Sequence, residues 1–169
     1  MIAILITSTV LLAGVGVLWQ EQHLGLPYVE GEQLARHRNV LTGSAQNPWR
    51  YRVFAEWVAA GFVKSAEILH VPRPVAVGFL GLRLLQNALI LVLTFTYYRR
   101  LGINRHQALV GVMVLAFAFT HAIDNSDLSF NTYFDVVSYL IAALAVLSGR
   151  TLSFLVIVVA AALNERQVV

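Results

Sequence analysis

The sequence predicts an all-α protein, a polytopic bundle of transmembrane helices. Of its 169 residues, 58% are hydrophobic and only 12% are charged, whereas soluble domains usually carry about 25% charged residues. So few charges cannot cover a surface that faces water, but they suit a surface that faces lipid. The apolar residues are gathered into long segments, and backbone groups in lipid must be satisfied within such segments, which favours helices.

Several apolar segments approach the roughly 20 residues that a helix needs to cross the hydrocarbon core. There are about five of them, at residues 2–19, 75–98, 108–123, 134–147 and 152–163. Residues 1–169 are therefore expected to form a single transmembrane domain, in which 20–74 is an outer loop between the first two spans. The longest span contains Arg83, which must face protein or water, with Glu56 or Glu67 as the expected partner.

Residues 51–69 are expected to form an amphipathic helix that lies along the membrane interface. Glu56, Lys64 and Glu67 make a crossing less favourable, although a short span facing a protein interior is the alternative. The apolar residues recur at helical spacings of three and four. They are Phe54, Val58, Phe62, Ala66 and Leu69.

Charge placement predicts the orientation. Arg99, Arg100 and Arg105 lie in or beside a short loop, and short loops rich in Lys and Arg stay in the cytoplasm. With 51–69 outside the bilayer core, this places the N-terminus in the cytoplasm and 20–74 outside. No dense Lys/Arg tract occurs, so membrane lipid is the expected partner and nucleic acid is not.

The predicted outer loop carries candidate catalytic and binding residues. Glu30 and Glu32 could act as a general base or bind a divalent cation. Arg50 and Arg52 could hold a phosphate through charge-assisted hydrogen bonds. The alternative is a solvated loop whose Trp, Tyr and Arg side chains are interfacial anchors.

A second acidic group follows the third span. Asp124 and Asp127 have no basic neighbour, and their carboxylates could bind Mg²⁺ or Mn²⁺, which prefer oxygen ligands. The alternative is that the polar residues of this loop cap the ends of the flanking helices. Arg166 directly follows the last span, where it could bind phosphate or simply end the span.

Two short stretches carry a family resemblance. They are NPWRYRV at 47–53 and AALNERQ at 161–167. Their order, around an acidic outer loop and a run of spans, resembles the bacterial polytopic GT-C glycosyltransferases of the mannosyltransferase-like class. The second stretch has Glu and Arg in exchanged order, and Glu30 or Glu32 stands where the family usually has an Asp.

The resemblance implies an enzyme of the bacterial cytoplasmic membrane that transfers a sugar from a polyprenyl phosphate. It also implies interface-parallel helices in the first outer loop, Glu30 or Glu32 as base, and phosphate binding by Arg50, Arg52 and Arg166. Family members are usually much longer, so a truncated or degenerate relative is also expected. The alternative function is a non-catalytic integral membrane subunit that packs in a larger membrane complex through small residues, such as Gly14, Gly16, Gly78 and Gly81.

Overall fold

The computed structural model describes residues 2–46, 53–121 and 130–164, and the described part is helical throughout, with short turns and no strand. This confirms the all-α prediction. The helices are α1 (Ile2–Tyr28), the π-helix η1 (Val29–Gln33), α2 (Leu34–Leu41), α3 (Val53–Ile68), α4 (Pro74–Arg100), α5 (Arg105–His121), α6 (Phe130–Leu147) and α7 (Thr151–Asn164).

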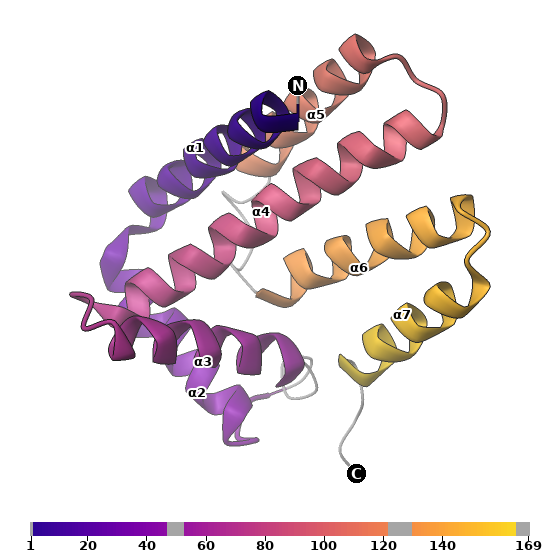
Figure 1. Cartoon of the computed structure of the whole chain (residues 1–169). Helices are drawn as coiled ribbons and strands as arrows, with labels where there is room; N and C mark the ends of the chain where they lie inside the picture. The colour runs from indigo at the N-terminus through magenta and orange to yellow at the C-terminus, as the bar shows by residue number, and fades with distance from the viewer. Residues whose placement is uncertain (1, 47–52, 122–129, 165–169) are drawn as a thin grey trace.

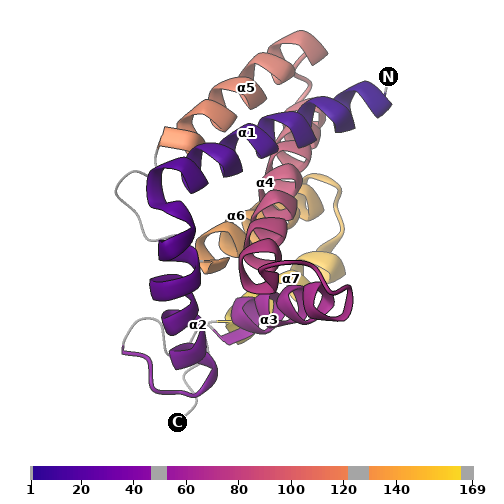
Figure 2. The same ribbon diagram turned by 90° about the vertical axis from the view of Figure 1, so that its left-hand side faces the viewer.

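Helix α4 is the centre of the bundle. It packs against α1, α3, α5 and α6, while α7 packs mainly on α6. Helices α1 and α5 run side by side along one flank of α4, and α6 and α7 lie on the other (Figure 1). Helices α2 and α3 gather at the end of the bundle where α4 begins (Figure 2).

The sequence of α4 explains its bounds and length. Pro74 occupies the first turn, where proline is tolerated, and Arg99 and Arg100 occupy the last turn, where cations favour the helix dipole. Among the described residues, α4 is the one helix long and apolar enough to cross a membrane, and the apolar stretches 105–120 and 132–147 are shorter. This agrees with the span predicted at 75–98.

The predicted outer loop 20–74 is largely helical in the structure. Helix α1 continues past the predicted end of the first span and kinks at Gly25, whose φ of 75° is accessible to glycine without a steric penalty. The chain then runs through η1 and α2, and after the residues outside the described part it resumes in α3. This segment therefore forms a helical insertion between α1 and α4.

Helix α3 coincides closely with the predicted helix 51–69. On its predicted apolar face, Phe54 is 46% exposed and Leu69 is 73% exposed. The side of α3 that is buried in the bundle consists of Ala55, Glu56, Ala59 and Ala66, of which Ala66 belongs to the predicted apolar face.

Close backbone packing explains why small residues form the buried side of α3. A Cβ atom at Gly78 of α4 would lie 2.7 Å from both N and Cα of Val63 in α3. The two helices thus touch backbone to backbone, and the small side chains of α3 face the contact. A hydropathy pattern selects large apolar residues, whereas this contact selects small ones.

The turn between α3 and α4 contains a strained residue. His70 has a φ of 53°, in the left-handed region, and ends α3 with bonds from His70 N to Glu67 O (3.0 Å) and from Val71 N to Ala66 O (3.0 Å). This is a Schellman-type helix end, whose left-handed position favours glycine.

We expect His70→Gly to stabilise the protein by about 1 kcal/mol, because a side chain disfavours this conformation. Thermal unfolding in detergent would show a higher midpoint. Ser65→Gly, within α3, is the control and should lower the midpoint because glycine disfavours helix interiors. An unfolding midpoint lower than that of the wild type for His70→Gly would show that the backbone at His70 is not strained.

Candidate functional site

Polar residues occupy the interior of the bundle near the start of α4. They come from α1, η1, α2, α3, α4 and α6, and together we call them the polar cluster. Its members are Gln20, Gln33, His37, Glu56, Arg83, Gln86, Asn87 and Tyr133, all buried. Because buried polar groups cost free energy unless they are partnered, their arrangement is informative.

The most tightly joined pair in the cluster is His37 of α2 and Glu56 of α3. Nδ1 of His37 lies 2.6 Å from Oε2 of Glu56, and both side chains are buried. The His37 ring also meets the edge of Phe79 of α4, with ring centroids 5.2 Å apart. The pair therefore holds the two helices of the insertion together and against α4.

Arg83 of α4 lies against aromatic rings of α6. Its Cζ is 3.9 Å from the centroid of the Tyr133 ring and 5.1 Å from that of Phe130, and such cation–π contacts strengthen when desolvated. The expected partner Glu67 instead meets the exposed Lys64 (Oε2 to Nζ, 3.2 Å). Glu56 bonds directly to His37 and also interacts electrostatically with Arg83.

Hydrogen bonds fix the beginning of α6 beside α1 and α4. Nε2 of Gln20 donates to the Tyr133 hydroxyl over 3.2 Å, and Nε2 of Gln86 donates to the Phe130 carbonyl over 3.0 Å. Both bonds are buried. They join α1 and α4 to α6, the helix that provides both aromatic rings against Arg83.

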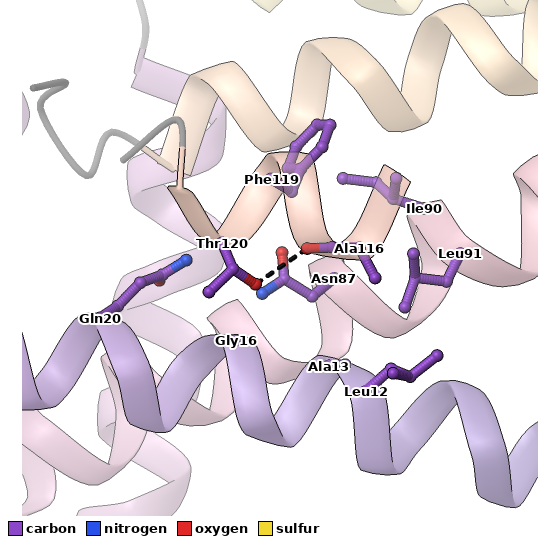
Figure 3. Close-up of a pocket in the computed structure, with 10 residues that line it drawn as sticks. All are labelled: Leu12, Ala13, Gly16, Gln20, Asn87, Ile90, Leu91, Ala116, Phe119 and Thr120. Atoms are coloured by element: carbon purple, nitrogen blue, oxygen red, sulfur yellow. Dashed lines mark hydrogen bonds between the residues drawn. The ribbon is translucent and has the colours of Figure 1, made fainter. Parts of the chain in front are cut away.

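Two small cavities lie on either side of Gln20. One is enclosed by α1, α4 and α5, with Gly16, Asn87 and Thr120 in its wall (Figure 3). The other has Glu21, Gln33 and Arg83 in its wall, beside Phe79. Glu21 and Arg83 therefore line the same small space.

Glu21 was missed by the sequence reasoning. It lies two residues beyond the predicted first span, where a polar residue looks like the ordinary end of a helix in the membrane. The run Gln20-Glu21-Gln22 was the available signal, since α1 continues through it and buries Gln20 in the bundle. Glu21 is only partly exposed.

Two of the predicted site residues lie in the described part of the chain. Glu30 and Glu32 lie on the exposed side of η1, whose Val29 and Gln33 face inward, so the structure does not bring them into the polar cluster. The other predicted residues lie outside the described part of the chain. They are Arg50, Arg52, Asp124, Asp127 and Arg166.

A divalent cation has no ligand set within the described ranges, where no three His, Asp or Glu side chains gather. The polar cluster offers different chemistry. A guanidinium suits an anion such as phosphate, and a partly buried carboxylate suits proton transfer.

No protein-family model matches the chain, and neither the curated proteins nor the solved structures contain a match.

Proposed function

We propose that this protein is a GT-C-like glycosyltransferase, or a truncated or degenerate relative, that transfers a sugar from a polyprenyl-phosphate donor. It is an integral protein of the bacterial cytoplasmic membrane with about five spans and a cytoplasmic N-terminus. The observation that carries the proposal is the helical insertion between α1 and α4, which packs on the start of α4 beside a buried arginine and an acid. The family resemblance implies helices at this place in the chain.

In this proposal Arg83 binds the donor phosphate. Arg83 lines the same cavity as Glu21, and guanidinium groups bind phosphate through charge-assisted hydrogen bonds. Arg50, Arg52 and Arg166 are proposed to add positive charge to the same phosphate. Charge stabilisation of this kind is needed because the phosphate is the leaving group.

We assign the general base to Glu21, because it shares the cavity with Arg83. It would take the proton from the acceptor hydroxyl as the bond from oxygen to the sugar forms and the bond from the sugar to the phosphate breaks. Glu30 and Glu32 are the alternative base, on the exposed side of η1. No step is assigned to a metal ion, although Asp124 and Asp127 stay the candidate Mg²⁺ or Mn²⁺ ligands.

The test uses the full chain in lipid nanodiscs with radiolabelled polyprenyl-phosphate mannose as the probe. Binding of the probe to the protein and transfer of labelled sugar to an acceptor fraction are measured separately. We expect Arg83→Gln to weaken binding at least tenfold. We expect Glu21→Gln to keep binding but to slow transfer by roughly 10²–10⁴-fold, the usual contribution of a general base.

The double variant Glu30→Gln, Glu32→Gln is the matched control. Full transfer by this variant supports Glu21 as the base. If this variant is inactive while Glu21→Gln stays active, the base is Glu30 or Glu32 on η1. If the wild-type chain neither binds the probe nor releases sugar, the proposed function fails.

A non-catalytic membrane subunit is the second candidate, favoured by the size of the two cavities, which are far smaller than a sugar. The small residues argue against it, because the chain uses several of them itself: Gly78 meets Val63, and Gly16 faces Thr120. A stable, stoichiometric complex with another protein on a native gel in mild detergent would favour this candidate.

A further inference from the structure

The cavity between α1, α4 and α5 has a polar side that the proposed function does not use. Its walls are mostly apolar, but Asn87 and Thr120 project into it from two helices and Gln20 closes one end (Figure 3). The space open to the centre of a water molecule is about 20 Å³. One ordered water needs roughly 10–15 Å³ of such space and two to four polar partners.

Asn87 is the residue that indicates a ligand. Its side chain is 8% exposed, and it forms no side-chain hydrogen bond within the described part of the chain. Figure 3 shows this amide directed into the space beside Gly16 and Thr120.

Gly16 makes the space. A Cβ atom at this position would lie 3.3 Å from Oγ1 of Thr120 and 3.8 Å from Nδ2 of Asn87. Two polar atoms of different helices thus converge on the place that a methyl group would fill. Gly14, two residues earlier in α1, has no neighbouring atom within 4 Å of its Cβ position.

We propose that this cavity binds one ordered water molecule that joins α1, α4 and α5. The water accepts a hydrogen bond from the amide nitrogen of Asn87. It donates to Oγ1 of Thr120, whose own hydrogen is donated to the Ala116 carbonyl over 2.8 Å. Its second hydrogen is donated to the carbonyl oxygen of Gln20.

The water extends the polar cluster to α5. The carbonyl oxygen of Gln20 accepts a hydrogen bond from the water, and Nε2 of Gln20 donates one to the Tyr133 hydroxyl. The Tyr133 ring in turn contacts the Arg83 guanidinium. A hydrogen-bonded path therefore runs from Thr120 on α5, through α1, to Tyr133 on α6. The buried amide of Asn87 is satisfied by the same molecule.

Solution NMR of the isotope-labelled chain in nanodiscs tests the site. The side-chain amide signals of Asn87 are identified by their loss in Asn87→Asp, and a rotating-frame experiment separates a dipolar contact with water from proton exchange. We expect a dipolar cross-peak with water in the wild type. Gly16→Ala should remove it by filling the space, and Gly14→Ala should keep it.

Thermal unfolding of Asn87→Leu provides a second, independent measurement. If water occupies the cavity, leucine displaces it and leaves the Thr120 and Gln20 oxygens without a partner, so the unfolding midpoint falls. An absent cross-peak in the wild type, or one that survives in Gly16→Ala, overturns the proposal. A raised midpoint for Asn87→Leu also overturns it, because it would mean that the cavity is dry.

Discussion

Gly78→Ala is expected to destabilise the protein by about 2 kcal/mol, although alanine is the better helix former. The new methyl group would lie 2.7 Å from backbone atoms of Val63, and backbone cannot rotate away as a side chain can. Helix α3 must then move off α4 and loosen the core that Phe79 and Leu82 form with Ala55 and Ala59. Overpacking of this kind costs about 1–3 kcal/mol.

Gly81→Ala is the matched control, with the same substitution less than one turn further along α4. Its methyl group would meet only Cδ1 of Phe62, at 3.8 Å, an ordinary contact. Without a clash, the helix preference of alanine over glycine, about 1 kcal/mol, should raise stability. Unfolding of both variants in the same detergent gives the comparison, and a Gly78→Ala protein as stable as Gly81→Ala would rule out the close contact.

Removing one member of the buried His37–Glu56 pair is expected to have the larger effect. In His37→Leu the Glu56 carboxylate keeps its buried position but loses the partner at 2.6 Å. Breaking a buried pair from one side typically costs 3–5 kcal/mol, while replacing both members by apolar residues is often neutral. We therefore expect about 4 kcal/mol of destabilisation in His37→Leu and recovery of most of it in His37→Leu, Glu56→Leu.

A double-mutant cycle over His37→Leu, Glu56→Leu and the double variant measures the coupling between the two side chains. The exposed pair of Lys64 and Glu67 provides the comparison, because exposed pairs contribute about 0–1 kcal/mol. Additive losses at His37 and Glu56 would mean that the two side chains do not act as a pair.

Local features of the chain were predictable, and contacts between distant residues were not. The all-α class and the bounds of α4 follow from a long apolar run with Pro74 at one end and Arg99 and Arg100 at the other. These signals are contained within one segment. The interpretation of 51–69 as a helix succeeded for the same reason.

The side of α3 that packs in the bundle could not be predicted from its own segment, because it depends on Gly78, a residue of another helix. The burial of Glu56 was equally hidden, since its partner His37 lies 19 residues away and on another helix. Glu21 was passed over because it shares a cavity with Arg83, which lies far along the chain and on another helix. The candidate site is assembled by these distant contacts, and hydropathy does not record them.

The π-helix η1 holds an extra residue between α1 and α2 without changing their rotational phase. A π turn holds one residue more than an α turn, through i→i+5 bonds, and commonly interrupts helices at functional places. Shortening η1 by one residue into regular α-helix would therefore leave α2 at nearly the same rotation relative to α1. One residue lost from a regular α-helix would instead turn the following segment by about 100°, the angle of one residue at 3.6 per turn.

The contact between His37 and Glu56 therefore tolerates the loss of one residue from η1. The exposed positions of Glu30 and Glu32 within η1 can also change in chemistry without disturbing the buried contacts. A residue lost from the regular turns of α2 ahead of His37 would not be absorbed in this way and would rotate His37 away from Glu56.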